Sequence, residues 1–200
     1  MRGKAHEAEK NRVKPNSEPI SKIEAAFRQL RTAVLLFFSD QDPVAVHTLA
    51  AAAHEILRQL AERKGIPVGL APAEMVAVLP GMTPEEAKAA LSVTAGFFKH
   101  AGRDPNDSIH FQPEINDHFL YEAVCLYEEL TSRHHPEFEH LKMIVTMRNP
   151  HLLPVSIAAD ERAKWEERAG KLKKDKITPS ILLKRVLGLE MPDRVTPDAG

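Results

Sequence analysis

The stretch DPVAVHTLAAAAHEILRQL, residues 42–60, carries the clearest helical signal in the chain. Asp42 and Pro43 form a typical helix start, because a capping carboxylate precedes a proline at the first helical position. After this start, apolar residues recur every three or four positions and so share one helix face; they are Val46, Leu49, Ala53, Ile56 and Leu60. The alanines at 50–53 have small side chains, so a second helix could approach this one closely.

Comparable helical patterns occur on both sides of this stretch. Upstream, an apolar stripe follows a candidate N-cap at Ser21; its members are Ile23, Phe27, Leu30, Val34 and Phe37. Downstream, further helices are expected to begin at or beside four prolines, which are Pro84, Pro113, Pro136 and Pro179. No stretch alternates with the period of a strand. The sequence therefore predicts an all-α fold, a single helical bundle of about five to seven helices with disordered termini.

Composition divides the chain into four parts. Residues 1–18 are polar, mixed in charge and without periodicity, so we expect a disordered leader. Residues 19–155 are predicted to form the helical bundle, and residues 156–190 a C-terminal helical extension with a charged helix around Trp165. Residues 191–200 are predicted to form a tail.

The cysteine content and the N-terminus indicate a soluble protein of the cytoplasm. Cys125 is the single cysteine, which fits a reducing compartment, and its apolar neighbours suggest a buried thiol. The N-terminus lacks the apolar run of a secretory signal. The apolar stretch 33–38 is far too short to span a bilayer, so no membrane association is expected.

Charge is unevenly distributed, although the net charge is only −1. Residues 1–22 contain six Lys and Arg against three Glu, and residues 160–185 contain nine Lys and Arg against five acidic residues. An acidic body therefore carries basic flanks. Solvated tails are the simplest interpretation, and an anionic partner such as a nucleotide or RNA is the sharper alternative.

The densest cluster of side chains that could take part in catalysis or ligand binding lies in GFFKHAGRDP, residues 96–105. His100 offers a general acid or base, and Asp104 offers a carboxylate that could orient it. Lys99 and Arg103 could clamp an anion. The catalytic candidates are therefore His100, Arg103 and Asp104. A structural alternative stays open, because cations complement the dipole at a helix C-terminus and the sequence Arg-Asp-Pro can fix a turn.

His47 and His54 lie two turns apart on the helix that begins at Pro43, so they share one face about 10 Å apart. At that distance they cannot bind one metal ion together. One interpretation makes them hydrogen-bonded histidines between two helices. The other makes them substrate- or anion-binding residues that act with Lys99 beside His100.

No metal site and no cofactor are predicted. His54-Glu55 begins like the HExxH motif of zinc proteases, but Arg58 stands where the second histidine is required. A second histidine group surrounds the helix start at Pro136; its members are His134, His135 and His140. Neither a cysteine nor a well-spaced carboxylate completes that group in the sequence.

The alanine-rich helix expected at 85–98 is the natural antiparallel partner of the helix that carries His47. That arrangement predicts that His100 lies nearer to His47 than to His54. The side chains then expected to face each other are Lys99 or Arg103 and Asp40 or Asp42.

Two segments, VHTLAAAAHEIL (46–57) and FFKHAGRDP (97–105), resemble a small bacterial family of helical proteins without an assigned activity. This likeness covers about residues 19–130 and implies little about chemistry. More loosely, the FKH helix end is similar to HEPN-type domains, many of which are RNases. Their catalytic pattern is an Arg, a polar residue and a later His, which implies two candidate pairs; these are Arg133 with His140 and Arg103 with His110. Both spans contain a proline, whereas that family keeps the pattern within one helix.

These patterns favour a soluble binding or interaction module, with an anion site around His100 and a homodimer as the expected assembly. The alternative is a HEPN-like RNase, or another enzyme that acts on a nucleotide or RNA phosphate through His100 and Arg103. An enzyme would need His100 in a pocket, with Asp104 and a second histidine close by.

Overall fold

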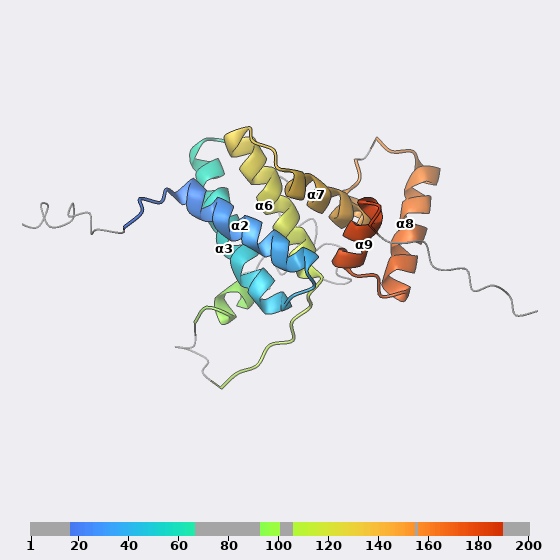
Figure 1. Cartoon of the computed structure of the whole chain (residues 1–200), viewed down its shortest axis with the longest axis horizontal. Helices are drawn as coiled ribbons and strands as arrows, with labels where there is room; N and C mark the ends of the chain where they lie inside the picture. The colour runs from blue at the N-terminus through green and yellow to red at the C-terminus, as the bar shows by residue number, and fades with distance from the viewer. Residues whose placement is uncertain (1–16, 67–92, 101–105, 155, 190–200) are drawn as a thin grey trace, which may run out of the picture.

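The computed structural model describes residues 17–66, 93–100, 106–154 and 156–189, and every regular element in these ranges is helical. The elements are α2 (Lys22–Phe38), α3 (Pro43–Arg63), α6 (Ile115–Thr131), α7 (Pro136–Arg148), the 3-10 turn η1 (Pro150–Leu152), α8 (Ala159–Lys174) and α9 (Pro179–Val186) (Figure 1). The predicted all-α fold is confirmed. The helix expected from Thr83 lies outside the described residues, apart from a helical segment at 93–97.

The sequence signals for helix starts act as expected. The side chains of Ser21, Asp42 and Thr178 each accept a hydrogen bond from a backbone N–H in the first turn of α2, α3 and α9. Prolines occupy the first positions of α3, α7 and α9. These caps satisfy N–H groups that have no partner inside the helix, so they fix where each helix begins.

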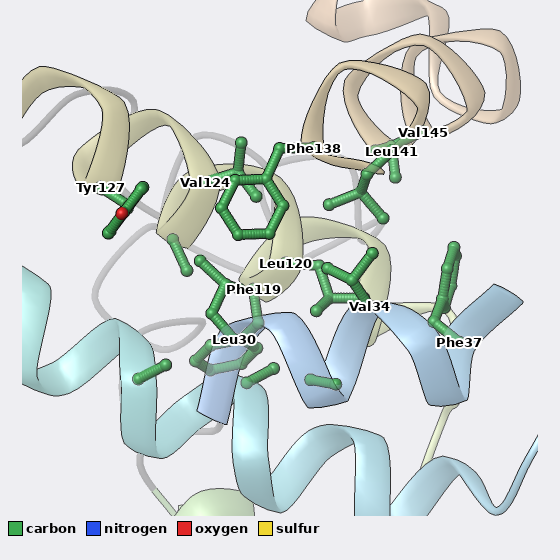
Figure 2. Close-up of a cluster of buried hydrophobic side chains, with 14 of the residues drawn as sticks. Leu30, Val34, Phe37, Phe119, Leu120, Val124, Tyr127, Phe138, Leu141 and Val145 are labelled. Atoms are coloured by element: carbon green, nitrogen blue, oxygen red, sulfur yellow. The ribbon is translucent and has the colours of Figure 1, made fainter. Parts of the chain in front are cut away.

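The hydrophobic core lies between α2, α3, α6 and α7. Figure 2 shows side chains from three of these helices meeting in it; they are Leu30, Val34 and Phe37 of α2, Phe119, Leu120, Val124 and Tyr127 of α6, and Phe138, Leu141 and Val145 of α7. All of them are buried. Burial of a large apolar side chain stabilises a fold by about 1.5–3 kcal/mol, so this cluster is the main source of stability.

α3 packs most extensively against α2 and α6. Three of the four alanines expected at a helix contact, Ala50, Ala51 and Ala53, are buried. The neighbours of these alanines are therefore α2 and α6. The partner expected from the sequence, the helix at 85–98, is described only from residue 93 onward.

α3 and α6 run in the same direction. Asn116 at the start of α6 donates a hydrogen bond to the Pro43 carbonyl at the start of α3, over 2.9 Å. At the other end, Lys64 Nζ reaches the carbonyl of Leu130 at 3.4 Å. Neighbouring helices that run in the same direction need a long crossover connection, and the chain between these two extends over residues 64–114.

The two C-terminal helices differ in how they join the bundle. α9 contacts α2 and α7, and its Leu182 belongs to the main core. Asp40, just after α2, accepts hydrogen bonds from the Thr178 hydroxyl at 2.8 Å and from the Ser180 N–H at 3.4 Å. α8 contacts α7 and η1 instead and lies at the edge of the molecule (Figure 1). The predicted extension 156–190 therefore includes one helix that completes the core.

The predicted leader and tail fall almost entirely outside the described residues. Of the leader, Glu18 accepts hydrogen bonds from both terminal nitrogens of the Arg28 guanidinium, at 2.6 and 3.0 Å. In the described part of the chain, no helix combines the length and the apolar character that crossing a membrane requires.

Candidate functional site

His47 is fully buried between α3 and α6. Its Nδ1 lies 3.0 Å from Oδ1 of Asn116, and the amide nitrogen of Asn116 donates to the Pro43 carbonyl. Because Oδ1 of Asn116 can only accept, Nδ1 of His47 is the donor and carries the ring proton. The other ring nitrogen, Nε2, is buried without a hydrogen-bond partner among the described residues.

Three phenylalanine rings surround His47. The ring centroids of Phe98, Phe111 and Phe119 lie 5.6, 5.3 and 4.9 Å from that of His47, all at steep angles to it. Phe98 also meets Phe111 edge-on at 5.2 Å. This aromatic surrounding joins the segment 93–100 to the start of α3, and it excludes water from the imidazole.

Burial lowers the pKa of His47, and the positive charge of Lys99 lowers it further, while the bond to Asn116 acts in the opposite direction. The folded protein therefore favours the neutral imidazole. A neutral ring with one nitrogen donating to Asn116 and the other enclosed by phenylalanines serves packing between helices. This agrees with the structural interpretation of His47 as a hydrogen-bonded core histidine.

His54 lies two turns further along the same face and meets a carboxylate. Its Nε2 is 3.0 Å from Oε2 of Glu122, and the two side chains are 8% and 5% exposed. The two atoms are close enough for an ion pair, but their orientation is unsuitable for a hydrogen bond. His54 Nε2 and Glu122 Oε2 are therefore both without a hydrogen-bond partner among the described residues. Phe119 packs edge-on between the two histidines, 5.4 Å from His54.

The predicted cluster around His100 is only partly described. Lys99 and His100 are exposed at the end of the helical segment 93–97, and Arg103 and Asp104 lie outside the described residues. Phe98 contacts His47, and its neighbour Lys99 acts on the pKa of that ring. The cluster therefore begins beside His47, but His54 is enclosed elsewhere, against Glu122.

The carboxylates expected to face Lys99 or Arg103 have other partners. Asp42 accepts hydrogen bonds from two backbone N–H groups at the start of α3, both at 2.9 Å. Asp40 binds the start of α9. No ion pair joins Lys99 to either carboxylate within the described ranges, so that pairing is not seen for Lys99.

A different polar site lies where the ends of α2 and α7 meet the starts of α3, α6 and α9. A hollow of about 190 Å³ opens there. Its lining combines apolar residues, among them Phe37 and Val46, with six polar ones, which are Asp40, Gln41, Glu114, Asn116, Asp117 and Arg148. The hollow therefore combines three carboxylates with one guanidinium.

Asp117 is the buried member of this lining, 2% exposed. Its Oδ2 accepts hydrogen bonds from Arg148 Nε and from Asn149 Nδ2, each at 2.8 Å. Its Oδ1 has no hydrogen-bond partner among the described residues. Burial raises the pKa of Asp117, against the opposing effects of Arg148 and Asn149, because a desolvated carboxylate is costly.

Sequence reasoning missed Asn116, Asp117, Glu122 and Arg148. A signal was present in the helix 115–131, where Asn116, Phe119, Glu122 and Ala123 recur at the spacing of one face. Polar residues within an apolar stripe indicate buried polar partners, since an unpaired buried polar group costs free energy. The histidine pair was weighed without these partners, which come from another helix.

The two pairs implied by the HEPN likeness are not placed within one helix in the described residues. Arg133 lies in the loop between α6 and α7, whereas His140 lies on α7. His110 is exposed in a loop before α6, and Arg103 lies outside the described residues. No family model, curated protein or solved structure matches the chain. The likenesses to a bacterial helical family and to HEPN domains therefore stay predictions.

Proposed function

We propose that this chain is a helical binding module whose ligand is a small cation with hydrogen-bond donors, such as an amine or a guanidine. The ligand would occupy the hollow at the junction of α2, α3, α6, α7 and α9. The observation that carries this proposal is Asp117, a buried carboxylate in the lining of the hollow with one oxygen that lacks a partner. This oxygen is shielded from solvent, so the lining must shift for a ligand N–H to reach it; the new bond would then remove the cost of an unsatisfied buried acceptor.

The charges of the lining support a cation. Asp40, Glu114 and Asp117 together outweigh Arg148, which already donates to Asp117. Glu114 is exposed and its side chain does not cap α6, so its carboxylate is available to a ligand. The hollow is smaller than the roughly 300–1,000 Å³ of most small-molecule pockets, which favours a compact ligand.

A direct test is to titrate the isotopically labelled chain with methylguanidine and ethylammonium and to follow amide shifts by NMR. Both cations should perturb residues around the hollow, and Glu114→Gln should weaken binding because one attracting charge is removed. Asp117→Asn should weaken it further. Glu129→Gln is the matched control, because Glu129 is an exposed carboxylate on the same helix and does not line the hollow.

Two results would contradict this proposal. One is binding that is equally strong in the wild type and in Glu114→Gln and Asp117→Asn. The other is selective binding of phosphate or a nucleotide at these residues without any effect of the cations. That second result would indicate an anion site in the hollow, distinct from the one expected around His100.

The enzymatic alternative remains a prediction that rests on His100 and Arg103. Its support in the described residues is limited to the exposure of Lys99 and His100 and to the contact of the preceding residue, Phe98, with the buried His47. Incubating the chain with single-stranded RNA tests it. Cleavage by the wild type that is lost in His100→Ala would establish it, and no cleavage in either would end it.

The expected homodimer is also a proposal. Exposed apolar side chains on α2 and at the end of α9 would suit such an assembly; they are Leu35, Val186, Leu187 and Leu189. Sedimentation at several protein concentrations measures the mass directly. A single species with the mass of one chain, 22.3 kDa, would exclude a dimer at those concentrations.

A further inference from the structure

A second group of polar side chains lies at the joint between α6 and α7, far along α6 from the hollow. Glu128 belongs to the last turns of α6, His134 to the connecting loop, and Glu139 to the first turns of α7. One ligand atom of each residue lies within 4.8 Å of the others. The three residues come from three successive segments, so the turn between the helices gathers them at one point.

The distances between the ligand atoms of this group are similar to those between the ligands of a bound metal ion. His134 Nδ1 is 3.4 Å from Glu128 Oε1 and 3.5 Å from Glu139 Oε1. Both distances are too long for good N–H···O hydrogen bonds. They match the edge of about 3.4 Å that a tetrahedron has when its metal–ligand bonds are about 2.0–2.2 Å long.

Glu128 supplies an observation independent of the spacing. Its side chain is only 10% exposed, and Oε1, the oxygen that faces His134, is buried without a hydrogen-bond partner among the described residues. The other oxygen, Oε2, accepts from Lys142 Nζ at 2.7 Å. A buried acceptor directed at an imidazole nitrogen and left unsatisfied is an arrangement that a bound cation would complete.

Lys142 lies beside the group, and its positive charge limits the affinity of the group for a metal ion. Its ammonium also donates to Glu139 Oε1 at 3.0 Å, and this bond is the largest cause of the lowered pKa of Glu139. A metal ion would share Glu139 with Lys142 and leave the bond to Glu128 Oε2 in place. Lys142 then holds the Glu128 carboxylate in position, as partners of metal ligands commonly do.

We propose that Glu128, His134 and Glu139 form a binding site for Zn²⁺, with water as the fourth ligand. One imidazole and two carboxylates suit this ion, which accepts both nitrogen and oxygen donors in a tetrahedron. Mg²⁺ fits less well, because it prefers six oxygen ligands. The site is independent of the hollow. The sequence did not bring this group together, because Glu128 comes from the preceding helix.

The test is isothermal titration of the untagged full chain with zinc chloride at neutral pH. We expect one ion per chain in the wild type. His134→Ala and Glu139→Gln should each weaken binding by at least about tenfold, since losing even an outer partner of a ligand costs about 10- to 100-fold. Both side chains are more than half exposed, at 66% and 53%, so these variants should fold.

Two controls address the other histidines. His140→Ala changes the residue next to Glu139 on α7, and it should bind zinc like the wild type. His151→Ala removes one member of a pair of histidines with tilted rings, His118 and His151, whose ring centroids lie 5.5 Å apart. It should also leave zinc binding unchanged.

A second readout does not depend on heat of binding. Zinc should shift the imidazole NMR signals of His134 and leave those of His140 unchanged. The proposal is overturned if the wild type binds no zinc, if all variants bind it equally, or if His140→Ala or His151→Ala removes binding while His134→Ala retains it.

Discussion

His54 Nε2 lies 3.0 Å from Glu122 Oε2 at the contact between α3 and α6, and both side chains are more than nine-tenths buried. Two turns earlier, the same pair of helices makes the contact between His47 and Asn116. Glu122 has no hydrogen-bond partner in the described ranges, so His54 is its one close polar contact there. The stability of each of these buried side chains therefore depends on its partner across the helix contact.

Glu122→Leu should destabilise the protein. The substitution leaves His54 buried without a polar partner, which costs about 1–3 kcal/mol in the free energy of unfolding. Urea denaturation measures the change. Glu129→Leu on the exposed face of α6 is the control, with an expected change within about 0.5 kcal/mol. The double variant His54→Leu/Glu122→Leu should recover stability relative to Glu122→Leu, and failure to do so would show that the two side chains are not coupled.

Stability should fall in acid through His118. Burial lowers the pKa of His118 to about 4 from 6.5, with further lowering by His151 and Lys173. The neutral His118 ring therefore contributes its full share to the free energy of unfolding above pH 6.5, the ordinary pKa of the ring in the unfolded chain. This contribution is lost as the pH falls from 6.5 towards 4, because the unfolded chain then binds a proton more readily than the folded one. This fall in pKa corresponds to roughly 3 kcal/mol.

Urea denaturation of the wild type and of His118→Gln over this pH range checks the prediction. The difference in stability between the two proteins should shrink as the pH falls from neutral to about 4, because only the wild type must protonate a buried ring. His110→Gln, at an exposed position, should follow the wild type at every pH. A parallel pH dependence in wild type and His118→Gln would contradict the assignment.

Ala53→Leu should destabilise the bundle by about 1–3 kcal/mol, because Ala53 is fully buried on α3 and a larger side chain would overpack the site. Ala45→Leu, on an exposed position of the same helix, should change stability little. Thermal unfolding, monitored by circular dichroism, gives the melting temperatures of the two variants for comparison. Equal melting temperatures would show that this part of α3 has room for a larger residue.

Cys125 should react slowly with iodoacetamide at mildly alkaline pH. Burial raises the pKa of its thiol to about 11, so little of the reactive thiolate is present. Mass spectrometry of the native protein and of the protein in urea measures the two rates. We expect much faster labelling after unfolding. Rapid labelling of the native protein would show that the thiol is accessible and ionised.

The fold could be predicted from the sequence because helix signals are local. Ser21, Asp42 and Thr178 cap their helices as the spacing indicates, and the prolines that follow two of them occupy first helical positions. These signals depend only on neighbouring residues. The partners of each helix depend on distant residues, and the sequence therefore did not show that α6 packs along α3 beside α2.

The candidate sites likewise combine features that local sequence predicts with contacts that depend on distant residues. The two alternatives for His47 could be stated from periodicity, but choosing between them required its neighbour Asn116, 69 positions later. Asp117 and Arg148 were not anticipated, since each is an ordinary charged residue until the fold buries one against the other. The cluster at 99–104 was recognisable from composition, although only Lys99 and His100 belong to the described residues.

The two polar contacts along α3 also determine the alignment of that helix on α6. An apolar contact lined by alanines and leucines tolerates several alignments, because one turn of sliding, 5.4 Å, replaces one small apolar residue by another. His47 and His54 do not tolerate it. The same slide would separate both from Asn116 and Glu122 at once and leave four polar side chains buried without partners. Competing arrangements of the same helices are thereby raised in free energy, so the chain has one folded alignment instead of several.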